Sequence, residues 1–248
     1  MIWGVDKESS GRARKRQKEV VGGYNNSVGG TLWRLMIVAY ENRLMYLVAA
    51  DRREAARVPA VGLETDDDHL HEAFDALTHG KDVWVWTYHG IRHLYHFLRT
   101  RFQFVKAAGG VVCTPEGDCL MIDRQGHWDL PKGMVEPVQG DSHRRHERLA
   151  EAARREVTEE TGVTPDKVNS LITKTYHIYD KYGGWHLKQT AWFGMTARRQ
   201  PTRPQSEEEI AQAVWVPRAE CLERLAGSFA SLRLLGEQLA TQQTVTRP

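Results

Sequence analysis

The stretch from Arg154 to Val163, with the sequence RREVTEETGV, constrains the fold of this chain more than any other. Apolar residues recur before it and within it at helical spacing: Leu149, Ala152, Ala153 and Val157. Gly162 stands where a helix ends, and Pro165 follows shortly after. The sequence therefore predicts an amphipathic helix that packs on a core and ends at this glycine.

Three glutamates of this helix, Glu156, Glu159 and Glu160, are spaced i, i+3 and i+4. Their carboxylates share one patch of helix surface, where like charges repel one another. A hard divalent cation would offset this repulsion, because Mg2+ binds oxygen ligands and retains waters for substrate phosphates. Taken alone, the triplet is more typical of a solvated acidic face. The choice between such a face and a metal site therefore depends on the neighbouring residues.

The neighbouring residues favour a metal site. The upstream segment 128–133 (WDLPKG) runs from apolar residues into a turn, and Arg155 can grip a neighbouring carboxylate with two hydrogen bonds. Gly133 together with 155–163 resembles the Nudix box, which is Gly, five residues, Glu, seven residues and Arg-Glu-apolar-x-Glu-Glu-x-Gly-apolar. The C-terminal half of that motif matches at every fixed position.

The N-terminal half of the motif departs from the family pattern. Gln139, not Glu, lies six positions after Gly133, whereas Glu147 keeps the seven-residue gap before Arg155. We interpret the difference as an eight-residue insertion at 140–147. Its early residues can cap a helix, so the insertion either extends the box helix by about two turns or forms a loop over the site.

The resemblance implies an α/β fold, a Nudix-type α/β/α sandwich with a mixed sheet. It also implies hydrolysis of a phosphoanhydride in a nucleoside diphosphate-linked or polyphosphate substrate. By the same resemblance Glu156, Glu159 and Glu160 are metal ligands, with Glu147 as a weaker candidate, and Arg155 holds Glu156 in place. The ion is expected to be Mg2+, with Mn2+ as the alternative, and to neutralise charge and activate a bound water. Which glutamate acts as general base is left open.

Substrate-binding residues are predicted in the loop and strands around the box. Lys132 and Gly133 lie in a Leu-Pro-Lys-Gly segment that resembles the subgroup acting on dinucleoside polyphosphates and diphosphoinositol phosphates. Three residues on the strands after the box could meet phosphates: Lys174, His177 and Lys188. An ordinary surface role suits these three about as well. Glu208, in an acidic run before a late strand, is the candidate for an additional carboxylate, with a solvated run as the default.

Two further segments precede the Nudix-like part of the chain. Residues 1–30 are basic and then glycine-rich, which predicts a disordered tail, and Met36 is an alternative start. Residues 31–103 begin with an expected hairpin, alternate strand-like and helix-like patterns, and predict a small α/β domain preceding the Nudix hydrolase domain at 104–248. We expect segment 31–103 to serve docking or dimerisation, with a homodimer as one expected form.

Composition narrows the range of partners. The 34 basic residues nearly balance 32 acidic ones, so no global field favours nucleic acid or a membrane surface. No apolar run approaches the length of a membrane span, and the N-terminus shows no signal core. The three cysteines, Cys113, Cys119 and Cys221, are scattered and odd in number, which predicts reduced thiols and a cytoplasmic location.

Two other functions compete with the hydrolase, whose expected partner is a small nucleotide or polyphosphate. A non-catalytic regulator that senses nucleotides through a Nudix fold is favoured by Gln139 and the insertion, and opposed by the intact glutamate triplet. An RNA-end pyrophosphohydrolase would use the basic tail, with salt-dependent RNA binding as its signature.

Overall fold

The computed structural model describes residues 24–28, 31–49, 62–64, 67–87, 91–137, 146–181 and 183–245. Its N-terminal part contains these elements: β1 (Tyr24–Val28), β2 (Thr31–Tyr40), β3 (Arg43–Ala49), β4 (Gly62–Glu64), α2 (Asp67–Thr78), β5 (Val83–Thr87) and α3 (Ile91–Arg101). Its C-terminal part contains the others: β6 (Gln103–Cys113), β7 (Asp118–Arg124), β8 (His127–Asp129), β9 (Lys132–Met134), α4 (Leu149–Thr161), β10 (Lys167–Lys181), β11 (Gly184–Thr196), η1 (Ser206–Glu208), β12 (Ile210–Pro217), α5 (Arg218–Ala226) and α6 (Ala230–Val245).

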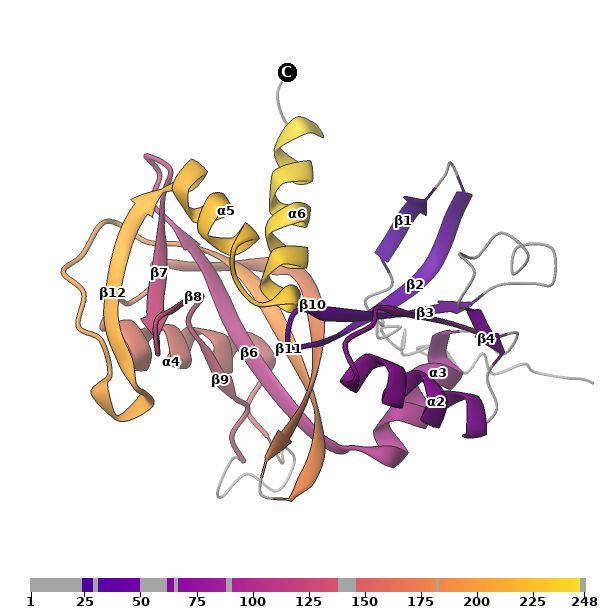
Figure 1. The fold of residues 1–248 in the computed structure, drawn as a ribbon. Helices are drawn as coiled ribbons and strands as arrows, with labels where there is room; N and C mark the ends of the chain where they lie inside the picture. Colours follow the sequence, from indigo (N-terminus) through magenta and orange to yellow (C-terminus); the bar gives the residue numbers. More distant parts are fainter. Residues whose placement is uncertain are drawn as a thin grey trace, which may run out of the picture.

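The strands of both parts belong to one mixed sheet (Figure 1). Its main path runs β12-β7-β6-β11-β10-β2-β3-β5-β4, and β1, β8 and β9 pair with β2, β7 and β6. β10 and β11 form a long antiparallel hairpin, while β11 runs parallel to β6. Helices α2, α3 and α4 lie on one side of this sheet, and α5 and α6 lie on the other. The predicted α/β sandwich around a mixed sheet is confirmed.

Strand β6 carries the helix with the glutamates. Its residues Ala108 and Val112 pack against Ala152 and Val157 of α4. Val111, which points to the opposite face, packs instead in the cluster that contains residues of α5 and α6. Neighbouring residues of β6 thus pack on opposite faces of the sheet, as expected for a strand that is buried on both faces. The apolar stripe predicted for the box helix is thereby the surface that fixes α4 on the sheet.

The N-terminal and C-terminal parts share one core. β2 pairs in parallel with β10, at Val38↔Tyr176 and Ala39↔His177. One buried cluster contains residues of both parts: Met36, Val38, Leu47, Leu77 and Leu98 with Tyr176, Ile178 and Leu187. The hairpin and the helices expected within 31–103 are confirmed, whereas the domain boundaries stay predictions.

One expectation about the N-terminal segment is corrected. Tyr24–Val28, inside the segment predicted to be a disordered tail, forms β1 on the edge of β2, while 1–23 and 29–30 lie outside the described residues. The C-terminal helical region consists of two helices, α5 and α6, because the chain turns at Gly227 and Ser228. There the Ser228 hydroxyl donates to the Trp128 carbonyl at 2.6 Å, which ties the turn to β8.

The cysteines also differ from the expectation of reduced thiols. Cys113 and Cys119 stand opposite each other in the β6–β7 hairpin and form a disulfide, with Cα atoms 4.2 Å apart. Cys221 is free and buried. The hairpin register brings the first two together, because they flank one short turn. The prediction is therefore wrong for this pair, and the cysteines no longer argue for a cytoplasmic location. Among the described residues, no helix is long and apolar enough to cross a membrane.

The shared core predicts that both parts unfold together. Ile178→Ala on β10 removes a fully buried side chain and should lower the free energy of unfolding by about 2–5 kcal/mol. Tryptophan fluorescence and far-UV circular dichroism in urea should report one shifted transition. Leu171→Ala on the same strand, where the side chain is 39% exposed, is the matched control and should change stability by less than about 1 kcal/mol. Two separate transitions, only one of them shifted, would contradict the shared core.

Candidate functional site

Both ends of α4 are capped, which fixes how the helix lies beside β9. Gly162 adopts a left-handed conformation, with φ 73°, and its N–H donates to the Thr158 carbonyl at 2.9 Å. This is the glycine-capped end that the sequence predicted. At the other end, Glu151 accepts a hydrogen bond from the Arg148 N–H at 3.0 Å. With both ends capped and the apolar stripe buried, the glutamates are held beside β9, the short strand that carries Lys132 and Gly133.

Gly133 is required by close packing against Glu156. A Cβ atom built on this glycine would lie 2.1–2.3 Å from the Glu156 carboxylate, far inside van der Waals contact. The first fixed residue of the motif therefore leaves room for a carboxylate more than twenty positions later in the chain.

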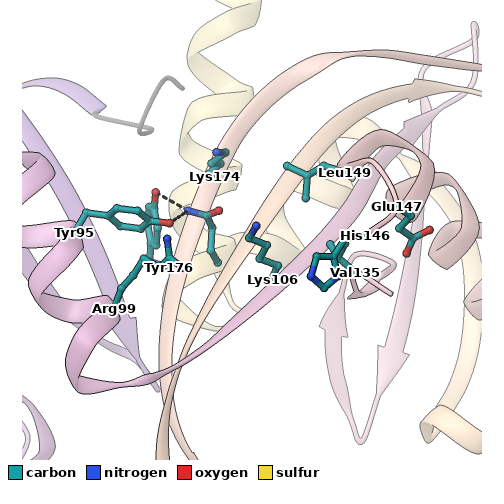
Figure 2. Close-up of a pocket in the computed structure, with 10 residues that line it drawn as sticks. Tyr95, Arg99, Lys106, Val135, His146, Glu147, Leu149, Lys174 and Tyr176 are labelled. Atoms are coloured by element: carbon teal, nitrogen blue, oxygen red, sulfur yellow. Dashed lines mark hydrogen bonds between the residues drawn. The ribbon is translucent and has the colours of Figure 1, made fainter. Parts of the chain in front are cut away.

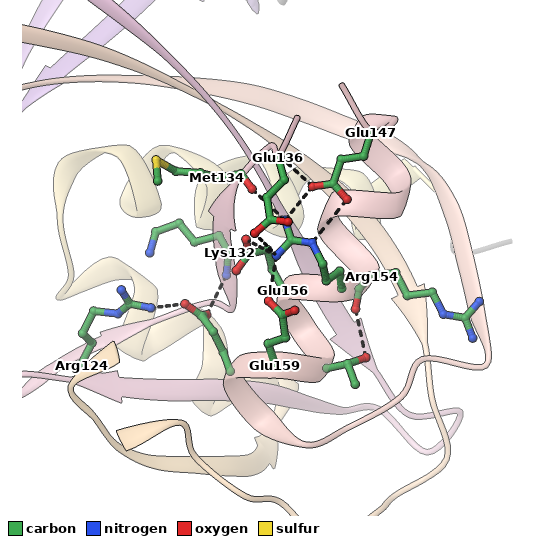
Figure 3. A network of polar contacts seen from close by, with 11 residues as sticks. Arg124, Lys132, Met134, Glu136, Glu147, Arg154, Glu156 and Glu159 are labelled. Carbon is green, nitrogen blue, oxygen red and sulfur yellow. Dashed lines mark hydrogen bonds and ion pairs between the residues drawn. The ribbon is translucent and has the colours of Figure 1, made fainter. Parts of the chain in front are cut away.

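Arg155 donates hydrogen bonds to Glu147, Glu156 and Glu159, three carboxylates labelled in Figure 3. One terminal nitrogen, Nη1, donates to Glu156 at 2.8 Å and to Glu159 at 2.7 Å. The other, Nη2, donates to Glu147 at 2.6 Å and to the Met134 carbonyl at 2.8 Å. The guanidinium thus ties the box helix both to the residue before it and to β9, as its rigid fork of donors permits.

The residues on either side of the insertion pair with each other, and the insertion does not lengthen α4. α4 begins at Leu149, so the expectation of a helix extended by two turns is wrong. Pro137 and His146 form an isolated antiparallel bridge, and the Glu147 N–H donates to the Glu136 carbonyl at 3.1 Å. The Glu136 N–H returns a hydrogen bond to the Glu147 side chain at 2.9 Å. The chain is therefore paired on both sides of segment 138–145, which includes Gln139 and lies outside the described residues.

Glu160 is the most buried of the three glutamates, with 1% of its surface exposed. It accepts a hydrogen bond from the Lys132 N–H at 2.9 Å and forms an ion pair with Arg124. Arg124 also pairs with Glu208 at 3.2 Å. The predicted additional carboxylate, Glu208, is thus brought to the same end of α4 through an arginine that the sequence analysis did not single out.

A group of cations lies beyond this loop. The Lys132 ammonium donates to Asp129 at 2.6 Å, and Asp129 is buried. His177 and Lys188 are cross-strand partners in the β10–β11 hairpin. Burial, reinforced by Lys188 and Lys132, lowers the pKa of His177 to about 4, so its ring is neutral at pH 7. Burial, followed by Lys132, lowers the pKa of Lys188 to about 8.

Lys174 does not join this group. It stands three residues before His177, so it points to the opposite face of β10, where it lines a different cavity with Lys106. The three residues predicted to meet phosphates together, Lys174, His177 and Lys188, are therefore divided between two faces of the sheet. Asp129 was missed as well, although its place in the WDLPKG segment, three residues before a lysine, could have indicated it.

The charges around α4 fit a divalent cation. Five glutamates, Glu147, Glu156, Glu159, Glu160 and Glu208, share two arginines, Arg155 and Arg124. Burial raises the pKa of Glu156 to about 7 and also raises that of Glu160. Burial favours protonation of Glu147 too, but hydrogen bonds from Arg155 and the Glu136 N–H outweigh it and lower the pKa.

The oxygen donors and the excess negative charge are those that Mg2+ prefers. In the described ranges, no three acidic, histidine or cysteine side chains are already assembled as a cage.

The family is shown by a direct match. The model of the NUDIX domain matches residues 103–234 of this chain, and the chain belongs to that family. It is a Nudix hydrolase, an enzyme acting on pyrophosphate bonds. Nudix hydrolases generally use divalent metals, which agrees with the charges around α4.

Solved structures with a similar fold include three of the same class. The MutT protein from Methanosarcina mazei Go1 has 21% identity and a TM-score of 0.42, covering 57% of this chain and 96% of that one. The NUDIX domain of Shewanella oneidensis NrtR with ADP ribose has 20% identity and a TM-score of 0.44, covering 58% and 92%. A C. elegans Ap4A hydrolase binary complex has 20% identity and a TM-score of 0.39, covering 57% and 96%. Likeness at this level says nothing about the substrate.

The contact between Gly133 and Glu156 gives a steric prediction. Gly133→Ala must push the carboxylate aside, which should lower stability by about 1–3 kcal/mol and turnover on the order of 100-fold. Gly194→Ala on β11 is the control, because its added Cβ would meet nothing closer than 3.7 Å. Thermal melting and hydrolysis rates of both variants test this, and an alanine variant at 133 with normal turnover would show that the close approach is not needed.

The raised pKa of Glu156 gives a pH prediction for the metal-free protein. Between its ordinary pKa of 4.5 and its folded pKa of about 7, the folded protein keeps a proton that the unfolded chain has lost. The stability from this group is therefore fully present below the lower value and falls as the pH rises toward the higher one. Glu156→Gln cannot titrate and should lack this fall.

Melting temperatures in EDTA, at about pH 5 and about pH 7.5, test the pH prediction. The melting temperature of the variant should rise relative to that of the wild type as the pH rises. A difference between the two proteins that does not change with pH would mean that Glu156 is already ionised at the lower pH.

Proposed function

We propose that this chain is a Mg2+-dependent pyrophosphohydrolase that cleaves a phosphoanhydride in a nucleoside diphosphate-linked or polyphosphate substrate, with Mn2+ as the alternative ion. Dinucleoside polyphosphates and diphosphoinositol phosphates are the favoured substrates, on the Leu-Pro-Lys-Gly segment at 130–133. The observation that carries the proposal is the group of five glutamates around α4 that form ion pairs with Arg155 and Arg124. Cations of the Lys132 loop and of β11 lie beside it.

In this proposal Glu156, Glu159 and Glu160 hold the ion, which when bound neutralises phosphate oxygens and lowers the pKa of a water. Arg155 fixes the directions of Glu156 and Glu159 before any substrate arrives. Such preorganisation is a large part of phosphoryl-transfer catalysis, because the reaction is mainly one of positioning and charge stabilisation.

Two residues have roles that differ from the simplest form of the motif. Glu147 has a lowered pKa and is held by Arg155, so it is suited to positioning the arginine and less suited to proton transfer. Lys188 has a pKa of about 8 and is largely protonated at neutral pH. An arriving phosphate would stabilise its charged form, so Lys188 is suited to bind the substrate anion.

Glu159→Gln tests the proposal, because Glu159 is the most exposed of the three glutamates, with 47% of its side chain accessible. Removing one charge there should change stability by less than about 0.5 kcal/mol. It should lower Mg2+-dependent turnover by about 100-fold or more, since charge stabilisation of the transition state is worth several kcal/mol. Glu116→Gln, in the exposed turn between β6 and β7, is the charge-matched control and should leave turnover unchanged.

The substrate panel for this test should contain dinucleoside polyphosphates, nucleotide sugars, oxidised nucleotides and inositol pyrophosphates. Hydrolysis of none of them, together with tight nucleotide binding, would favour the regulator instead. Salt-dependent RNA binding that is lost with residues 1–30 would favour the RNA-end enzyme. A homodimer and a cytoplasmic location remain predictions, and gel filtration and fractionation would test them.

A further inference from the structure

A polar cavity of about 130 Å3 lies on the α4 side of the sheet (Figure 2). It is bounded by α3 on one side and by the residues just before α4 on the other, with β6, β10 and β11 as its floor. It faces away from His177 and Lys188, which point to the opposite side of the sheet. The glutamates that the proposed function uses to hold metal do not line it.

Three cationic side chains from three different elements line this cavity: Arg99 of α3, Lys106 of β6 and Lys174 of β10. Within the part of the chain that the structure describes, neither Arg99 nor Lys106 forms a salt bridge. The Arg99 guanidinium lies instead over the Phe104 ring, 4.4 Å from its centroid. The acid at the rim, Glu147, is already bound by Arg155. The charges of Arg99 and Lys106 therefore line the cavity without a carboxylate partner among the described residues, and an anion bound there would offset their repulsion.

One hydrogen bond at the cavity wall ties α3 to the sheet. The Gln189 side-chain nitrogen donates to the Tyr95 hydroxyl and to the Tyr176 hydroxyl, at 3.1 Å each. Gln189 is also the register partner of Lys106. Because Tyr95 and Arg99 are one turn apart on α3, this contact holds the guanidinium beside the sheet.

The size of the cavity limits what can enter. Pockets that enclose a whole small molecule are about 300–1,000 Å3, so this one holds a single group rather than a complete nucleotide. A tetrahedral phosphate offers several oxygens at once, which suits an arginine fork and a lysine ammonium that come from different elements. The charge, the size and the mixture of donors agree on one kind of ligand.

We propose that this cavity is a binding site for a phosphate group, built by adding α3 to the Nudix fold. Arg99 and Tyr95 precede residue 103, where the family match begins, so they lie outside the matched domain. At its other rim, Glu147 binds Arg155, and Arg155 binds Glu156 and Glu159. A phosphate in the cavity would stand beside the residue that holds this arginine. The proposal does not depend on the reaction proposed above.

The binding experiment uses the full metal-free chain. Inorganic phosphate, up to about 10 mM, is titrated in EDTA at constant ionic strength and followed by calorimetry. Arg99→Gln with Lys106→Gln should weaken phosphate binding by about tenfold or more. Arg101→Gln, on the same helix but outside this cavity, should bind as the wild type does. Melting curves confirm that each variant is folded.

No phosphate binding by the wild type, or equal binding by the double variant, would overturn the proposal. A second double variant, Arg99→Lys with Lys106→Arg, keeps the charge and should retain most of the binding if the first one fails to fold.

Activity measurements then identify where the phosphate comes from. If the site holds the far end of the substrate, inorganic phosphate should compete with substrate, and Arg99→Gln should raise KM with little change in kcat. If it holds a separate ligand, phosphate should alter kcat, and Arg99→Gln should abolish that response. Should no substrate be hydrolysed at all, the proposed function fails while the binding result still stands, so the two can be told apart.

Discussion

The contacts of Arg155 are the interaction on which the rest of the site depends. One guanidinium reaches carboxylates on both sides of it in the sequence, at Glu147 and Glu159, and the backbone carbonyl of Met134 on β9. Without that cation, several carboxylates would face one another in partly buried positions, where repulsion is only weakly screened. The arginine therefore holds a strained acidic surface together and leaves it still negative, which is the state in which a surface attracts a divalent ion.

The chain tolerates its long insertion because of local pairing. Glu136 and Glu147 exchange hydrogen bonds. This pairing fixes where the chain enters α4 and does not depend on the number of residues between the two glutamates. Loop closure costs little more for a longer loop when its ends are already paired. Gly133, the middle residue of β9, supplies the second constraint, since it lets Glu156 sit against the backbone.

The sequence predicted the parts of the site that depend on local spacing. The glutamates at i, i+3 and i+4 and the glycine cap of α4 needed only helix geometry. Arg124 and its pairing with Glu160 could not be found in that way, because the contact depends on where β7 ends relative to α4. The division of Lys174 from His177 was accessible, since an odd spacing on a strand places two residues on opposite faces. The role of Arg99 depends on how α3 docks on the sheet, which no local pattern encodes.

The most direct test of the account is a titration of the full chain with Mn2+, followed by electron paramagnetic resonance, with turnover measured on the same samples. The wild type should bind the ion and hydrolyse substrate in proportion to the occupied sites. Glu160→Gln should lose both together, because its carboxylate is buried at the centre of the charge excess. Turnover that persists in a variant with no bound Mn2+ would contradict the claim that these glutamates hold a catalytic metal.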